Sequence, residues 1–505
     1  MKNKQPSRLR RWLKRSAFTL AVLITLLAAV VVFENWRGHR AWQKYRAEQE
    51  AKGEVFDWRK LLPAPVPDEQ NFAQTPLLAK LMDYKYDPQT QQPVFADPEA
   101  KARIDGLFAW KDSLRGEGSW RKTTPTDWRT IQDSLRALTN STLPAVQALL
   151  ARAVGKPEDD VLFLLAENET ELDEMIAAAQ RPHSDFLVHY EEGTLALLPQ
   201  LAVIKNFTYA LRLRALARLE SNSTDDALAD WQICMRLGDA LRGDPLLISL
   251  LLRLAIYDMS SQVVWEGLAK RQWSGGQLQD IEARLNDLNL VAEALVALRG
   301  ERAFNMMALD QWHLREMTGF PDRLPGEGHG SRIFPSGRVS QNKLAIARMY
   351  ELFIFGAFDA ERRIVDVALA NQYEREAGQT LSQSHPYTTM AARLFPAIHL
   401  ASLKVSNGQI ALNLARVGCA LERHRLAHGS HPAALNALVP AYLEAIPLDL
   451  DQQPLRYQLQ PDGSFILYSI GVDLKDDNGR IGKPNGQFSH DVGDWVWKYP
   501  EAADR

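Results

Sequence analysis

Cysteine is scarce in this chain of 505 residues, and complete catalytic motifs are missing. Only Cys234 and Cys419 occur, far apart and each within an apolar helical pattern, and there is no C-x-x-C. We interpret both as small buried hydrophobic residues, while a disulfide between them stays open. The chain also lacks G-x-S-x-G, which excludes a nucleophile elbow. Its glycine-rich "GEGHGSR" lacks the Gly-Lys-Ser/Thr of a phosphate-binding loop.

Acidic residues are missing from the first 15 positions, and charges of either sign are missing from residues 16–33. The head, residues 1–15, carries only basic charges: Lys2, Lys4, Arg8, Arg10, Arg11, Lys14 and Arg15. The run that follows, "SAFTLAVLITLLAAVVVF", is long enough to cross a hydrocarbon core at about 1.5 Å per residue. We predict an uncleaved transmembrane anchor over residues 16–33. A cleaved signal peptide is the alternative.

The basic head also predicts the orientation of the anchor. Basic flanks stay in the cytoplasm, so we expect a single-pass protein of a bacterial inner membrane, with its bulk in the periplasm. Trp36 suits the membrane interface, and Trp42 is a second candidate. The chain has 59 basic and 62 acidic residues, and the head holds seven of the basic ones. The exported part is therefore acidic, and we expect the lipid bilayer, not nucleic acid, as a partner.

Beyond the anchor, hydrophobic periodicity predicts a mainly α protein: a helical body followed by a small C-terminal α+β domain. Proline and glycine mark the boundaries between its parts. The predicted parts are a juxtamembrane helix, Pro-rich linker and mixed region over 34–125, a helical domain over 126–403 with a Gly/Pro loop at 318–338, and the terminal domain over 404–499.

Within the helical domain, two helices at 209–220 and 226–241 flank the turn "SNSTD". Apolar residues recur in both at spacings of three and four, which predicts an antiparallel helix pair. Asp225 is the expected N-cap of the second helix. Helical pattern resumes over 341–378 after the Gly/Pro loop.

The terminal region combines one long helix with strands. An apolar stripe ending at Leu421 predicts a helix that stops at Gly429, where a left-handed cap is expected. "HPAALNALVPAYL" predicts a second, short helix. Alternating residues in "LRYQL", "SFILYSIG" and "DWVWKY" predict three strands, with Trp495 and Trp497 on one face of the last.

Four sequence blocks in this region resemble the major pseudopilin family of type II secretion. "ALERHRLAHGSHP" is similar to that family's helix end, "IPLDLDQQPLRYQL" to its Pro-x-Asp…Tyr stretch, "LYSIGVD" to its Tyr-Ser-x-Gly-x-Asp, and "DVGDW" to its Asp-Ile-Gly-Asn-Trp ending. The blocks lie in the family's order over about 404–498 and cover under a fifth of the chain. The resemblance implies a helix packed on a small antiparallel sheet.

The resemblance also implies a calcium site in the loop after "LYSIGVD". Its ligands would be Asp473 and Asp491, with Asp476 and Asp477 as additional candidates; carboxylates suit this hard cation. The family's glycine after the first aspartate is Leu474 here. An ordinary polar turn without metal stays open as the alternative.

Two further patterns have simpler interpretations than catalysis or metal binding. His424 and His428 have metal-ligand spacing but extend an apolar stripe, so we expect packed side chains. Ser340 and Lys343 fit S-x-x-K, although the accompanying motifs of penicillin-binding enzymes are missing, and we expect Ser340 to be an N-cap. No catalytic residue is assigned.

These features together predict a membrane-anchored, non-enzymatic envelope scaffold or secretion accessory with an envelope or secretion protein as its partner. The alternative is an extracytoplasmic enzyme, hydrolase-like, with a site between the helical body and the loop at 318–338. The sequence does not determine the oligomeric state.

Overall fold

The computed structural model describes residues 8–87, 90, 92–318, 336–381 and 387–499, and it is mainly α, as predicted. The chain forms two compact units. Unit 1 comprises Met1–Lys60, Arg302–Phe353 and Glu374–Pro396. Unit 2 comprises Leu61–Glu301, Ile354–Tyr373 and Ala397–Arg505. The domain boundaries drawn from the sequence stay predictions.

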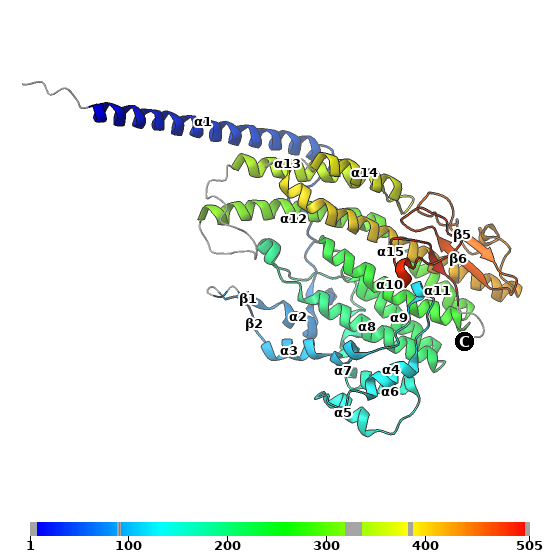
Figure 1. The fold of residues 1–505 in the computed structure, drawn as a ribbon. Coiled ribbons are helices and arrows are strands. Elements are labelled where there is room, and N and C mark those ends of the chain that lie inside the picture. The colour runs from blue at the N-terminus through cyan, green and yellow to red at the C-terminus, as the bar shows by residue number, and fades with distance from the viewer. Residues whose placement is uncertain (1–7, 88–89, 91, 319–335, 382–386, 500–505) are drawn as a thin grey trace, which may run out of the picture. The chain divides into compact units, whose positions relative to one another are not determined.

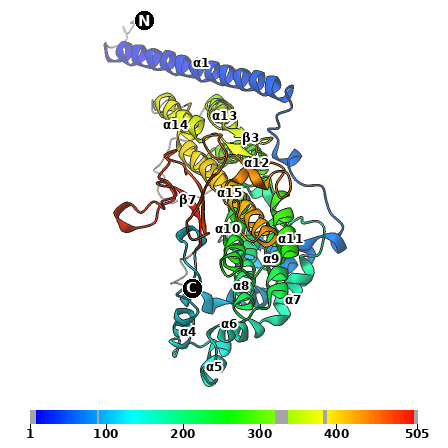
Figure 2. The same cartoon turned by 90° about the vertical axis from the view of Figure 1, so that its right-hand side faces the viewer.

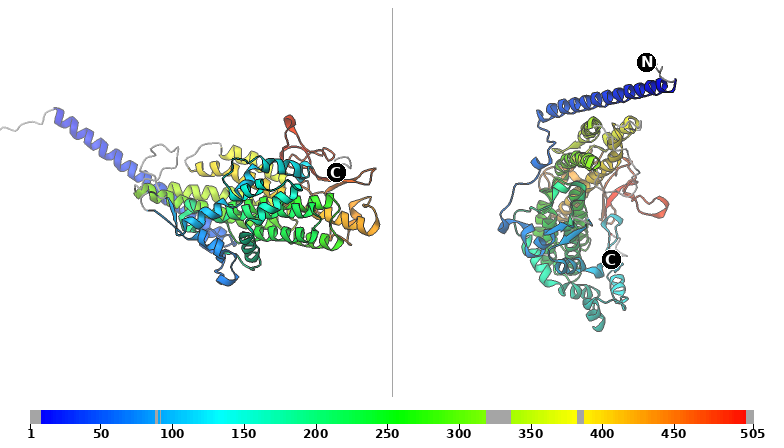
Figure 3. Two further views of the ribbon diagram at one scale, coloured as in Figure 1. Left: turned by 90° about the horizontal axis from the view of Figure 1, so that it is seen from below. Right: turned by 90° about the vertical axis from the view of Figure 1, so that its left-hand side faces the viewer.

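Unit 1 is built from long helices. Its first helix is unbroken from the head through the apolar run into the polar segment, as Figure 1 and both views of Figure 3 show in blue. The helices that contribute residues to unit 1 are α1 (Arg8–Glu50), α12 (Leu290–Thr318), α13 (Ser336–Phe353), α14 (Val367–Leu381) and α15 (Thr389–His428).

The polar half of α1 packs directly on α13. A Cβ atom at Gly38 would lie 2.2 Å from the carbonyl oxygen of Gly337, and one at Gly337 would lie 2.2 Å from that of Glu34. Because neither glycine has a side chain, the two backbones touch at this crossing. Further along, the Tyr45 hydroxyl donates to Glu351 at 2.6 Å. The polar half of α1 is therefore part of a folded unit.

Unit 2 contains the rest of the helical body. Its helices α8, α9 and α10 lie side by side (Figures 1 and 2). Its helices and strands before α12 are α2 (Pro76–Met82), β1 (Tyr84–Tyr86), β2 (Pro93–Phe95), α3 (Pro98–Gly106), α4 (Trp128–Arg136), α5 (Pro144–Ala151), α6 (Pro157–Ala166), α7 (Glu169–Ala178), α8 (Pro199–Glu220), α9 (Thr224–Asp239), α10 (Leu247–Ala269) and α11 (Gly275–Asn286).

The predicted helix pair is confirmed as α8 and α9. Their tight connection places Asn222 at φ 61°, a left-handed conformation that asparagine tolerates. Asp230 of α9 is buried and pairs with Arg214 and Arg218 of α8, each at 2.7 Å. Because a buried carboxylate needs a partner, this pairing fixes the register of the two helices.

The terminal region is a helix against a three-stranded antiparallel sheet. The strands, in the order β5-β6-β7, are β5 (Arg456–Leu459), β6 (Phe465–Ser469) and β7 (Trp495–Trp497), with Tyr457 opposite Leu467 and Leu467 opposite Trp497. The expected cap is confirmed, because α15 ends at His428 and Gly429 has φ 81°.

Strand β7 ties this sheet into the core of unit 2. A Cβ atom at Gly418 of α15 would lie 2.9 Å from the indole nitrogen of Trp497, and the ring of Trp497 lies 5.2 Å from that of Trp120. The indole N–H of Trp265 in α10 donates to the carbonyl of Lys498 at 3.0 Å. The sheet and the helical body therefore share one hydrophobic core.

The structure corrects several local predictions. Asp225 lies inside the first turn of α9, whose N-cap is Ser223, because the helix starts earlier than its apolar pattern. The helix expected over 341–378 is interrupted by a short hairpin, β3 (Phe358–Asp359) with β4 (Ile364–Val365). The short helix expected after Gly429 is only the 3-10 turn Leu435–Leu438.

Candidate functional site

The apolar half of α1 has no protein partner among the described residues. The most apolar 18-residue stretch of α1 is 0% buried, and Phe18 is 72% exposed. Thr19 and Thr25 bond their hydroxyls to the carbonyls of Arg15 and Ala21, four residues back. The helix is therefore long and apolar enough to cross a membrane, and both threonine hydroxyls are satisfied within the helix.

A second helix, α10, has comparable length and apolar character but a different environment. The most apolar 18-residue stretch of α10 is 67% buried, so α10 is a core helix of unit 2. Trp36 is 56% exposed, and its interfacial position stays a prediction, whereas Trp42 is 5% exposed. Trp42 packs edge-on against Phe56 at 5.4 Å. Trp42 is thus a core residue of unit 1, and its assignment to the membrane interface was wrong.

The aspartate corner, residues 472–479, begins shortly after β6 ends. The chain turns at Gly471, with φ 69°, and again at Leu474, with φ 57°. The second value is the left-handed conformation that favours glycine. Leu474 stands where the pseudopilin-like pattern has glycine, and it adopts this left-handed conformation although it has a side chain.

A buried carboxylate that the sequence did not single out holds the corner. Asp494 is 2% exposed and accepts backbone N–H groups from three residues: Asp477 at 3.2 Å, Gly479 at 2.6 Å and Arg480 at 3.2 Å. Burial raises the pKa of Asp494, and the three N–H donors oppose that shift. A single carboxylate thus closes the turn from inside.

The predicted calcium ligands lie around this turn. Asp473 accepts the backbone N–H of Gly493 at 3.2 Å, which brings it close to the segment that holds Asp491. Asp476 accepts the hydroxyl of Tyr468 at 3.2 Å. Asp477 contributes its backbone N–H to Asp494.

These aspartates have the hard oxygen donors that calcium prefers. In the described part of the chain, however, no three acidic, histidine or cysteine side chains gather closely enough to hold a metal ion. The side chains thus have the chemistry of calcium ligands, but they are not gathered into a site among the described residues. Calcium binding stays a prediction.

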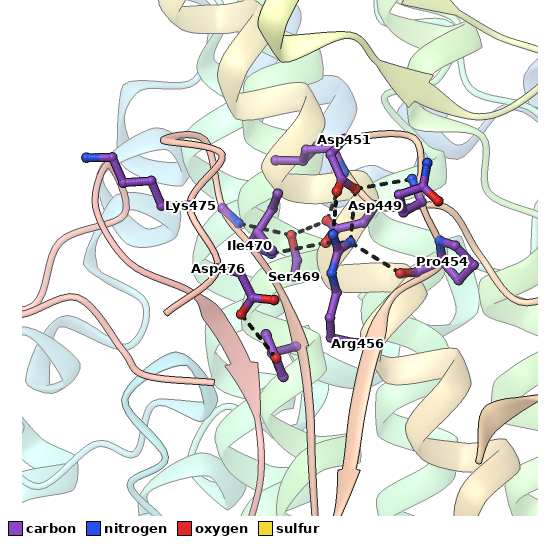
Figure 4. A network of polar contacts seen from close by, with 12 residues as sticks. Asp449, Asp451, Pro454, Arg456, Ser469, Ile470, Lys475 and Asp476 are labelled. Carbon is purple, nitrogen blue, oxygen red and sulfur yellow. Dashed lines mark hydrogen bonds and ion pairs between the residues drawn. The ribbon is translucent and has the colours of Figure 1, made fainter. Parts of the chain in front are cut away.

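A second buried aspartate, Asp449, joins the loop before β5 to the end of β6 (Figure 4). It is 0% exposed and accepts the Ser469 hydroxyl, the Ile470 N–H at 3.0 Å and a guanidinium N–H of Arg456 at 2.9 Å. Arg456 also pairs with Asp451. Burial raises the pKa of Asp449, while its hydrogen bonds oppose this. The hydrogen bonds of Asp449 therefore fix the end of β6, from which the chain enters the aspartate corner.

Both missed residues had a signal in the sequence. Asp449 is the aspartate of the Pro-x-Asp block, and Asp494 replaces the asparagine of the family's Asp-Ile-Gly-Asn-Trp ending. Both lie outside the run of three aspartates at 473–477, and that run was the feature that drew attention.

The remaining candidates have structural partners. Cys234 and Cys419 are buried free thiols, as the first interpretation expected. The rings of His424 and His428 lie 4.3 Å apart, but His428 is exposed, so it is not packed as predicted.

Ser340 lies inside α13 and is not its N-cap, because that helix begins at Ser336. Its hydroxyl contacts Nδ1 of His39 at 2.9 Å, and Lys343 pairs with Asp310. The two residues of the S-x-x-K pattern therefore have different partners. Most of the loop at 318–338 lies outside the described residues.

Comparison with known proteins identifies no relative: no protein-family model, no curated protein and no solved structure matches this chain.

Proposed function

We propose that the protein is a membrane-anchored, non-enzymatic scaffold or secretion accessory of the bacterial envelope. The single observation that carries the proposal is α1, whose apolar half is exposed while its polar half is packed on α13. An exposed apolar run of this length is unfavourable in water and favourable in a bilayer. We take the basic head as cytoplasmic and the two units as periplasmic.

The continuity of α1 supports a scaffold role. The same helix that would cross the bilayer enters the core of unit 1 without a break, and the glycine contact between Gly38 and Gly337 leaves no room for a side chain. A rigid joint of this kind holds the orientation of a folded unit relative to the membrane, which a flexible linker does not.

The terminal region supports the secretion part of the proposal. A long helix packs through Gly418 on β7 of a three-stranded antiparallel sheet, which is the arrangement that the pseudopilin-like blocks imply. The partner would be an envelope or secretion protein that recognises this region.

Topology and anchoring are tested by reporter fusions and fractionation. A periplasm-dependent reporter fused after the C-terminal residue should be active, and a cytoplasm-dependent one silent. A triple variant in which aspartate replaces Leu20, Ile24 and Leu27 should move to the soluble fraction or stay trapped in the cytoplasm. A matched triple replacement by valine should change nothing. A mature N-terminus near Glu34 would contradict the retained anchor.

The scaffold role is tested in the native membrane with the full chain. A photo-crosslinking residue at Val492 or Leu459, which are exposed on the terminal region, should give one discrete adduct with an envelope protein. The control carries the same photo-crosslinking residue at Val154, which is exposed on the helical body, and should give no such adduct. A catalytic turnover that depends on residues of unit 2 would overturn the non-enzymatic assignment.

A further inference from the structure

A small cavity in unit 2, half open to solvent, shares no lining residue with the aspartate corner. Its volume is about 210 Å³, which equals roughly seven water molecules at about 30 Å³ each. It lies where the ends of α7 and α9 meet the segment 179–184. The lining residues include Phe72, Gln180, Arg181, Ser184, Arg236 and Asp239.

Two arginines line this cavity, and neither has a carboxylate partner among the residues that the structure describes. Arg181 uses one guanidinium nitrogen to donate to three carbonyls, those of Asp68 at 2.9 Å, Asn71 at 2.8 Å and Gln74 at 3.3 Å. Arg236 donates through one nitrogen to the side-chain carbonyl of Gln180 and to a backbone carbonyl.

Neutral acceptors therefore hold both side chains in place. Arg181 is half-buried and Arg236 is exposed, so both keep N–H groups that a ligand in the cavity can reach. Among the half-buried arginines of unit 2, Arg181 is unusual, because most of them have a carboxylate partner. Arg136, for example, pairs with Asp160, and Arg214 pairs with Asp230.

A third polar group in the lining has no partner. The hydroxyl of Ser184 is buried and makes no hydrogen bond within the described part of the chain. The one acidic residue of the lining does not compensate the arginines, because its own charge is engaged elsewhere. Asp239 accepts the hydroxyl of Tyr257 at 3.0 Å and pairs with Arg284 and Arg242.

We propose that this cavity binds a small oxyanion, a carboxylate or a phosphate group, between Arg181, Arg236 and Ser184. A guanidinium presents N–H donors in a planar fork that matches the two oxygens of either group, and a fixed guanidinium loses little freedom on binding. The Ser184 hydroxyl is closed to solvent and has no partner within the described residues, and rotation of this side chain brings it to the ligand as a further donor. Phe72 gives one apolar wall, which suits a ligand with a short carbon part. The site is independent of the function proposed above.

Calorimetric titration of the full chain in detergent tests this site. Sodium phosphate and sodium acetate are the probes, and sodium chloride at equal ionic strength is the blank. We expect saturable binding of one ion per chain for at least one probe, at or below about 10 mM. The tighter probe identifies phosphate or carboxylate as the natural group.

Variants locate the binding. Arg236→Gln should weaken it roughly tenfold or more, because a hydrogen bond to a charged group is lost together with the charge. Ser184→Ala removes a hydroxyl that the fold does not use, so it should weaken binding and leave the melting temperature unchanged. Arg129→Gln, at an exposed position, and Ser221→Ala are the matched controls. Absence of saturable binding to either probe, or equal binding by all four variants, would overturn the proposal.

Discussion

Two groups of carboxylates in the terminal region differ in what holds them. Asp449 and Asp494 are buried and accept several hydrogen bonds from the protein. The acidic side chains of the aspartate corner are clustered in the sequence and more exposed. The two buried carboxylates hold the backbone from inside, whereas Asp473 and Asp476 of the corner each accept two hydrogen bonds around the turn. Density of charge in a sequence is thus a poor guide to structural importance, because a buried charge needs donors and not neighbours of its own sign.

The largest effect is expected at Asp449. Asp449→Ala leaves the Arg456 guanidinium and the Ile470 N–H without their buried acceptor, which should lower the free energy of unfolding by about 3 to 5 kcal/mol. Urea unfolding of the full chain, followed by tryptophan fluorescence, measures it.

The control for this prediction is the double variant Asp449→Leu with Arg456→Met. It removes both charges and should lose less stability than the single change. If the single and double variants are equally stable, Asp449 and Arg456 do not act as a pair.

A pH titration sharpens the comparison through a third buried carboxylate. Burial of Glu422 is outweighed by hydrogen bonds from Arg425 and by His431, which lower the pKa of Glu422 to about 2. A lowered carboxyl pKa adds stability that is present above the unfolded value of 4.5 and is lost as the pH falls towards 2. The loss should amount to about 3 kcal/mol. Glu422→Gln should flatten this part of the profile, whereas Asp491→Asn should leave its slope unchanged.

Asp494 should have the next largest effect. Asp494→Ala leaves the N–H groups of Asp477, Gly479 and Arg480 without an acceptor, and we expect a loss of about 2 kcal/mol. Amide hydrogen exchange should rise at these three positions. Asp477→Ala keeps the backbone N–H that Asp494 accepts. Its free energy of unfolding should therefore stay within about 0.5 kcal/mol of the wild type. Equal losses for Asp494→Ala and Asp477→Ala would break the comparison.

Much of the fold could be predicted from the sequence because its signals are local. The helix pair α8–α9, the cap at Gly429 and the three terminal strands follow from periodicity and turn residues. The errors lie where tertiary contacts override those signals. Trp42 is an aromatic residue shortly after an apolar run, and only its packing on Phe56 reveals that it belongs to a core. Nothing local indicates that Asp494 reaches back across 15 residues to close the corner.

The smallest effect tests whether the clustered carboxylates have a ligand. A calcium ion would have to draw Asp473 and Asp491 together across the contact that Asp473 already makes with Gly493. Binding only to the folded chain stabilises it by mass action, by about 1.4 kcal/mol at a tenfold excess over the Kd. The full chain should therefore melt higher with calcium than with a chelator, and magnesium should do less because it demands a tight octahedral shell. Asp473→Ala should remove the difference, whereas Asp462→Ala, at an exposed turn, should keep it. If calcium changes neither the wild type nor the variant, the hydrogen bonds of the protein fix the corner without a metal. The pseudopilin-like blocks would then indicate a shared arrangement of helix and sheet only.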